Sequence, residues 1–347
     1  MSLLEGSWFG GKPVFFYKFA RGPLTWCYTS SDREQTLGED TYLPLPIKPP
    51  SIRQGSEKGR RSFSIELPRY AAVAANWFPY SPSEAITLVV LCRHVGETET
   101  IVEAQGRVVG PVFTDHMLEL TCEPTMTKGR RGGNPRRLTV GCDLVLYSQG
   151  RGLCNLDPHA VPVPATLTEV GELTLTITAA EFAAAPRNLA GGLIEWTDAG
   201  EVVQQIAIVS HSGETITLAS WNAELLADLE LTAYTKPLTV AATVTAVSGL
   251  TVTAAEFSEY ASGRLAGGFV EWLRADGATE IRTIREHSGS TITLDYGAAD
   301  LAVDLIITAY PGCAHTWAAC GELENQINYG GNLHLPLENP YGGDPVW

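Results

Sequence analysis

Four cysteines are the residues of this chain whose types and spacing best suit chemistry. Cys142 and Cys154 flank a turn-rich segment with several glycines, and Cys313 and Cys320 flank a second short segment just after a turn. Two pairs of loop cysteines can meet as a four-thiolate site, and thiolates select zinc or iron–sulfur clusters. The close Cys-x-x-Cys pair of a zinc ribbon is absent, so spacing alone leaves structural free thiols as the alternative.

The other three cysteines lie in strand-like segments. Cys92 and Cys122 alternate with aliphatic residues, and Cys27 stands between Trp26 and Tyr28. This pattern predicts small, buried, hydrophobic side chains. Seven cysteines cannot all pair as disulfides, and no secretory signal is visible at the N-terminus, so a reducing compartment is favoured.

The patterns of common enzymes are missing from the sequence. There is no phosphate-binding loop, no Gly-x-Ser-x-Gly elbow and no His-Glu-x-x-His motif. His211 and His287 occupy matching places in an internal repeat, which indicates a turn residue duplicated with its module. Asp115 and His116 have no evident partner serine. We therefore predict that the protein is not an enzyme.

Composition indicates a folded protein with more than one structural region. The 347 residues suggest two or three domains at about 150 residues each. Apolar residues make up 44% and charged residues 18%, which argues against disorder. No apolar run approaches the roughly 20 residues of a membrane helix, so no membrane anchor is expected. The net charge of −15 is concentrated in residues 156–347, which contain 6 basic and 24 acidic residues, and this disfavours nucleic-acid binding there.

The N-terminal region has the pattern of a β structure. Alternating and aromatic-rich segments predict strands over 13–20, 24–28, 62–67, 86–92, 100–109 and 116–123. A hairpin is expected between residues 30 and 42, and one or two helical turns over 71–77. The basic segment 128–137 predicts a loop, either solvated or forming salt bridges at an interface.

An internal repeat follows. Thr178–Phe182 recurs as Thr253–Phe257, and Leu189–Trp196 recurs as Leu265–Trp272, at an offset of 75 and then 76 residues. Two copies of this length predict two small β modules in tandem. The spacing of Thr178 and Glu181 is that of a capping box, which predicts a short helical turn in each module. Paired glycines in each copy predict a tight turn or a close approach of two backbones.

The C-terminal residues carry a family resemblance. Gly312-Cys-Ala-His-Thr-Trp-Ala-Ala-Cys320, then Asn325, Asn328-Tyr-Gly-Gly331 and His334-Leu-Pro336, resemble the closing signature of a phage baseplate hub family. Its members are hub proteins of siphophage tails and gene transfer agents, related to the lambda tail tip protein. Similar stretches include Trp26–Thr29, Thr41–Pro44, 142–154 and 265–272, so the resemblance covers most of the chain. The chain departs from the family in its second module, in its wider first cysteine pair, and in Leu323, Tyr329 and Leu333 where phenylalanines are expected.

The resemblance implies a structural hub stabilised by an iron–sulfur cluster, of the four-iron kind, on Cys142, Cys154, Cys313 and Cys320. Zinc is the alternative metal. It also implies a homotrimer in the tail tip of the virion, assembled in the host cytoplasm. The implied partners are the distal tail protein ring, the central tip or tail fibre protein, and the tape measure protein, with no sequence-specific nucleic-acid binding.

We therefore expect a mainly β chain with four parts. These are a barrel-like or sandwich-like hub region at 1–164, modules at 165–237 and 238–311, and a cluster-binding segment at 312–347 packed back on the hub. Two other functions stay open. A tail-tip adhesin would stack sugars on Trp196 and Trp272, unless these are buried core residues, and a cell-wall hydrolase would need a catalytic constellation that the sequence does not show.

Overall fold

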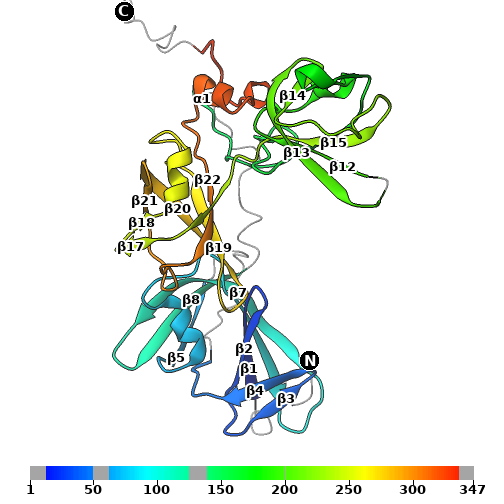
Figure 1. Ribbon diagram of the computed structural model, residues 1–347. Coiled ribbons are helices and arrows are strands. Elements are labelled where there is room, and N and C mark those ends of the chain that lie inside the picture. Colours follow the sequence, from blue (N-terminus) through cyan, green and yellow to red (C-terminus); the bar gives the residue numbers. More distant parts are fainter. Residues whose placement is uncertain (1–12, 50–61, 125–138, 199, 336–347) are drawn as a thin grey trace, which may run out of the picture. The chain divides into compact units, whose positions relative to one another are not determined.

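The computed structural model describes residues 13–49, 62–124, 139–198 and 200–335 (Figure 1). It confirms the mainly β prediction. Packing divides the chain into two compact units: residues 1–135, 271–282 and 295–305 form the first, and residues 136–270, 283–294 and 306–347 the second. The four domain boundaries expected from sequence stay predictions. The basic segment 128–137 falls outside the described residues. Among the described residues, no helix is long and apolar enough to cross a membrane.

The first unit contains one eight-stranded sheet in the order β3-β4-β2-β1-β6-β7-β8-β5. Its strands are β1 (Pro13–Arg21), β2 (Leu24–Thr29), β3 (Gln35–Leu37), β4 (Asp40–Pro44), β5 (Phe63–Pro68), β6 (Thr87–His94), β7 (Ile101–Phe113) and β8 (Met117–Pro124). The expected helical turns are present as a 3₁₀ helix, Ala72–Trp77. A backbone bridge between Lys48 and Glu66 links the segment after β4 to the edge strand β5. This segment therefore lies beside β5, the last strand of the sheet.

Strand alternation builds the core of this sheet. Phe63, Ile65 and Leu67 of β5 are buried, and Leu120 and Cys122 of the paired strand β8 are fully buried. The prediction of buried, hydrophobic cysteines is confirmed for Cys92 and Cys122, whereas Cys27 is half-buried. Burial raises the pKa of Cys122 to about 12, which keeps its thiol protonated and unreactive at neutral pH.

The two modules form sheets of identical strand order, which confirms the repeat. The first sheet has the order β10-β11-β14-β13-β12-β15-β9 and the second β17-β18-β21-β20-β19-β22-β16. The first contains β9 (Pro162–Thr166), β10 (Glu169–Gly171), β11 (Thr176–Thr178), β12 (Leu193–Thr197), β13 (Val203–Ser212), β14 (Thr215–Leu218) and β15 (Glu230–Tyr234). The second contains β16 (Val240–Thr243), β17 (Ala246–Ser248), β18 (Thr251–Thr253), β19 (Phe269–Leu273), β20 (Thr279–Ser288), β21 (Thr291–Leu294) and β22 (Ile306–Tyr310).

Each module also contains the expected short helix, but not the expected cap. The 3₁₀ helices Ala180–Ala184 and Ala255–Glu259 each place a phenylalanine, Phe182 or Phe257, in the core. Their N-caps are Ala179 and Ala254, and neither makes a side-chain cap hydrogen bond. The capping-box prediction is therefore wrong, because Thr178 ends strand β11 and its hydroxyl lies 3.2 Å from the Thr215 hydroxyl on β14.

The remaining helices are short. Glu172–Thr174 and Gln326–Asn328 are 3₁₀ helices, and α1 spans Trp317–Glu322. In the second unit, β22 leads directly into the segment that carries α1 (Figure 1).

The paired glycines allow a close backbone approach, as predicted. A Cβ atom on Gly192 would lie 1.9 Å from the Tyr234 carbonyl oxygen, and one on Gly268 would lie 2.0 Å from the Tyr310 carbonyl oxygen. Neither contact can relax by turning a side chain, because both involve backbone atoms. Glycine is therefore required at these two matching positions.

We predict that Gly192→Ala destabilises the first module by about 2–3 kcal/mol, since the methyl group overpacks against backbone. The measurement is urea unfolding combined with hydrogen exchange of the β12 and β15 amides. Gly110→Ala is the control, because nothing lies within 4 Å of its added Cβ. Equal effects of the two substitutions would contradict the prediction.

Candidate metal centre

The four cysteines singled out in the sequence line one small pocket of the second unit. The lining residues come from the 142–156 segment and from the chain between β22 and the C-terminal 3₁₀ helix: Cys142, Leu144, Leu146, Cys154, Leu156, Cys313, His315, Thr316, Cys320, Leu323, Asn325, Asn328 and Tyr329. Four of the nine lining residues other than cysteine are leucines. Residues that are 171 positions apart in sequence, such as Cys142 and Cys313, therefore share one apolar environment.

Local structure positions the second cysteine pair. The Thr316 hydroxyl caps α1 by accepting a hydrogen bond from the Ala319 amide at 3.1 Å. The Cys320 amide donates to the Thr316 carbonyl at 3.0 Å, which places the Cys320 thiol on the buried side of the helix. Cys313 precedes the helix, in the segment that follows β22.

Hydrogen-bond donors point at three of the sulfur atoms. The His315 amide lies 3.4 Å from the Cys313 sulfur, and the Gly330 amide lies 3.4 Å from the Cys142 sulfur. The side-chain amide of Asn325 lies 3.6 Å from the Cys154 sulfur. Hydrogen bonds to sulfur favour the thiolate form and tune the potential of clusters that thiolates hold.

Further hydrogen bonds join the two chain segments around the pocket. The Cys142 amide donates to the His315 carbonyl at 2.8 Å, and the Tyr329 hydroxyl donates to the Val140 carbonyl at 2.7 Å. The buried Asn325 side chain donates to the Cys154 carbonyl at 2.7 Å. The Tyr147 hydroxyl donates to the Pro311 carbonyl at 2.6 Å. The C-terminal segment is thus fixed to the 139–156 segment by direct contacts.

Several residues around the cysteine pocket have strained backbone conformations. Tyr147, Asn155, His315 and Glu324 all have positive φ angles between 52° and 61°, a conformation that side chains disfavour. Gly330 is confined as well, since an added Cβ would lie 2.6 Å from Leu144 Cγ and 3.1 Å from the Cys142 sulfur. The Gly330 amide can approach that sulfur because the residue has no side chain.

Burial and repulsion between neighbouring cysteines favour the neutral form of the Cys313 and Cys320 thiols. Burial, followed by the charges of Cys313, Cys154 and Cys142, raises the pKa of Cys320 to about 11. Burial also raises the pKa of Cys313, with Cys154 and Cys142 adding to the shift and the His315 amide opposing it. These couplings place the four groups within electrostatic reach of one another. A cation bound among them would reverse the preference.

The donor set fits a metal group, although the thiols are not drawn around one point. Four soft sulfur ligands in an apolar pocket with amide donors suit zinc or an iron–sulfur cluster. In the parts of the chain that the structure describes, no group of three or more His, Cys, Asp or Glu side chains has the geometry to hold a single ion. The assignment of Cys142, Cys154, Cys313 and Cys320 as ligands therefore stays a prediction.

The two matching histidines have a structural role. The Nδ1 atoms of His211 and His287 accept from the amides of Leu189 and Leu265, at 3.2 and 3.4 Å. Their Nε2 atoms lie 2.9 Å from the carbonyls of Gly213 and Gly289 and donate to them. Each ring therefore joins two loops of its own module, as expected for duplicated turn residues.

The matching tryptophans are buried. Trp196 and Trp272 are each 3% exposed. Their indole nitrogens donate to Glu224 at 3.3 Å and to Asp300 at 2.9 Å. They are core residues, so neither ring face is free to stack on a sugar.

Sequence reasoning missed the parts of the pocket that are not cysteine. Asn325 and Gly330 belong to the motif that carries the resemblance, and their presence there was the available signal. Their contacts to Cys154 and Cys142 depend on a fold that spacing does not reveal. The hydrogen bond from the His315 amide involves the backbone, so no residue type in the sequence indicates it.

Comparisons with known proteins found a partial family match, one curated relative and one similar solved structure. Residues 263–339 match a family described as "Phage conserved hypothetical protein BR0599". The whole chain aligns at 25% identity with an uncharacterized protein of Xylella fastidiosa (strain 9a5c), over 99% of that protein. Among solved structures, a chain from the virion of a native gene transfer agent particle is similar at a TM-score of 0.49 and 14% identity, over 99% of this chain and 94% of that one.

Proposed function

We propose that this chain is a structural baseplate hub of a siphophage-like tail, stabilised by an iron–sulfur cluster on Cys142, Cys154, Cys313 and Cys320. The observation that carries the proposal is the convergence of these four thiols in one apolar pocket. The motif-level resemblance to baseplate hubs and the match of residues 263–339 to a phage protein family support the phage context.

The positions of the cysteines suit a crosslink between two distant segments of the chain. Cys154 precedes both modules and Cys313 follows them, so ligation of all four closes a loop that contains both modules. Closing a long loop costs only about 0.6 kcal/mol for each doubling of its length. Structural thiolate–metal sites contribute on the order of 10 kcal/mol, which exceeds this cost by a wide margin.

We favour a cluster over zinc as the group bound by these thiolates. A structural zinc ion draws four ligands to about 2.0–2.3 Å from a single point. The described cysteines share a pocket but do not form such a point. Cys142, Cys154, Cys313 and Cys320 would hold a four-iron cluster, which would supply positive charge that stabilises their thiolates. A zinc-stabilised structural tail protein is the alternative.

The chain's own residues prepare the site. Asn325 and the amides of His315 and Gly330 orient three thiolates, while Leu144, Leu156 and Leu323 exclude water from the sulfur atoms. The hydrogen bonds of Tyr147 and Tyr329 hold the segments together. The role we propose for the cluster is structural, and the protein is not an enzyme in this account.

The remaining expectations follow from the hub role. The hub is proposed to be a homotrimer in the tail tip, assembled in the host cytoplasm. It would lie between the distal tail protein ring and the central tip or tail fibre protein, near the tape measure protein. An adhesin role has less support, because the burial of Trp196 and Trp272 removes the sugar-stacking surface on which it depended.

The test is anaerobic purification with iron, sulfide and zinc analysis and a visible spectrum. We expect a brown protein with iron and sulfide near four per chain, and we expect Cys313→Ser to lose most of both. Losing a few kcal/mol of ligation should also lower the unfolding temperature of the second unit by about 10 °C. Cys27→Ser is the matched control, because Cys27 is a half-buried cysteine of the first unit. A colourless protein with stoichiometric zinc would support the four-cysteine site but with zinc as its metal. The absence of both iron and zinc would contradict the proposed site.

A separate prediction concerns Gly330. Gly330→Ala adds a Cβ that would crowd Leu144 and the Cys142 sulfur, so we expect weaker cluster retention with all four ligands still present. The measurement is the rate at which absorbance is lost under a chelator, which we expect to rise at least about tenfold, or about 1.4 kcal/mol. Gly110→Ala is the control, since Gly110 has no left-handed φ and nothing lies within 4 Å of its added Cβ. Unchanged retention would show that this close approach does not matter to the site.

A further inference from the structure

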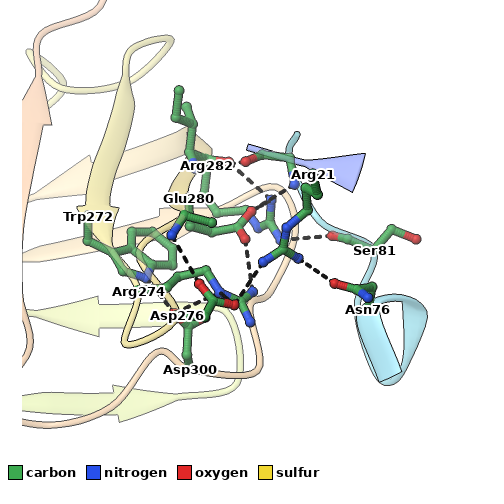
Figure 2. A network of polar contacts seen from close by, with 12 residues as sticks. Arg21, Asn76, Ser81, Trp272, Arg274, Asp276, Glu280, Arg282 and Asp300 are labelled. Carbon is green, nitrogen blue, oxygen red and sulfur yellow. Dashed lines mark hydrogen bonds and ion pairs between the residues drawn. The ribbon is translucent and has the colours of Figure 1, made fainter. Parts of the chain in front are cut away.

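The first unit contains a charge-balanced network of three arginines and three acidic side chains. The arginines are Arg21, Arg274 and Arg282, and the acids are Asp276, Glu280 and Asp300 (Figure 2). Arg21 lies on β1 of the eight-stranded sheet, whereas the other five belong to residues 271–282 and 295–305 of the second module. We call these two stretches the docking segments.

Arg21 connects the sheet to the docking segments. Its side chain is 1% exposed, and its guanidinium donates to Asn76 at 2.7 Å and to Asp276 at 2.9 Å. An arginine this deeply buried is costly unless its charge is paired. Asp276 is thus a required partner of a residue in β1.

Glu280 is the buried centre of the network. Its side chain is 2% exposed, and its two oxygens lie 2.7 Å from Arg282 and 3.1 Å from Arg274. It also accepts from the Ser83 amide at 2.8 Å, and the Ser83 hydroxyl accepts from the Ile281 amide at 3.1 Å. One carboxylate therefore joins the docking segments to the loop before β6.

Arg282 and Gly297 complete the contact. Arg282 donates to the Ser81 carbonyl at 2.9 Å and to the Gly297 carbonyl at 3.0 Å. The Tyr80 and Tyr296 rings meet edge to face at 5.3 Å. A Cβ on Gly297 would lie 2.5 Å from the Tyr80 ring, so a side chain at 297 is incompatible with this packing.

The first module has different residues at the matching positions. With the offset of 76, Arg274 corresponds to Asp198, Glu280 to Gln204, Arg282 to Ile206 and Gly297 to Trp221. Gln204 donates to Asp198 at 2.8 Å, so this pair is satisfied within its own module. Ile206 belongs to the core of the first module, with Trp221 packed against that core.

We propose that Arg274, Glu280, Arg282 and Gly297 are specificity-determining residues, which select the second module and exclude the first from the contact with the eight-stranded sheet. The first module has Gly200 in place of Asp276, so it lacks the partner of Arg21. It also lacks the charged groups that bond to the backbone of Ser81 and Ser83, and Trp221 leaves no room for Tyr80. The family match at residues 263–339 covers the second module and not the first, as expected if the second is the anchored copy and the first the addition. This inference does not depend on the cluster.

The test uses site-specific crosslinking in the full-length protein. Ser83→Cys is combined with Ile281→Cys, or with Gln205→Cys at the matching position of the first module. A short thiol-reactive crosslinker is added, and the linked peptides are quantified by mass spectrometry. We expect the 83–281 link to exceed the 83–205 link at least tenfold. Comparable yields, or a preferred 83–205 link, would overturn the proposal.

Substitutions toward the first module supply the second arm. Adding Gly297→Trp or Arg282→Ile to the 83–281 pair should reduce that link at least fivefold. Arg285→Ala is the matched control, because Arg285 lies on the same strand, is 54% exposed and pairs only with Glu286 among the described ion pairs. Near-ultraviolet circular dichroism and amide exchange of β12 show whether the rest of the chain stays folded. An undiminished link in folded Gly297→Trp and Arg282→Ile proteins would also contradict the proposal.

Discussion

The gathering of four thiols in one apolar pocket is the constraint on which the second unit depends. Desolvation and mutual repulsion raise the pKa of Cys320 to about 11 and also raise that of Cys313. The pocket is therefore unfavourable for thiolates unless a cationic group shares it. Amide donors lie near three of the sulfur atoms, and the capped helix α1 carries Cys320. The positive φ angles of residues around the pocket are held in place by the packing and hydrogen bonds that join its two chain segments.

Part of this arrangement was readable from the sequence because it depends on local pattern. Alternation predicted β5, β6 and β8, and internal identity predicted two equivalent modules. Cysteine spacing separated Cys142, Cys154, Cys313 and Cys320 from the core cysteines. Paired glycines predicted the close approach at Gly192 and Gly268. Each of these signals requires knowledge of only a few neighbouring residues.

The rest depends on tertiary contacts that spacing does not encode. The capping box failed because Thr178 finds a partner hydroxyl across the sheet, on Thr215, instead of at the helix terminus. The positive φ angles of His315 and Asn155 give no signal in residue type beyond the general tolerance of asparagine. The buried network was equally hidden, since Arg21 and Asp276 are 255 positions apart. In composition, its six charged residues look like ordinary surface charges.

The two copies of the module are alike where contacts lie within a module and differ where they reach outside it. Both copies keep the residues whose contacts lie within one module. These include the histidine that joins two loops and the tryptophan whose indole donates to an acidic side chain. The copies diverge where side chains reach beyond the module, as at Arg282 and Ile206. The 158 residues between Cys154 and Cys313 would be roughly halved by removing one copy. Closing the longer loop therefore costs only about 0.6 kcal/mol more, which is small beside a four-thiolate site. Because both cysteine pairs lie outside the repeat, a second module can be accommodated without moving any of the four cysteines.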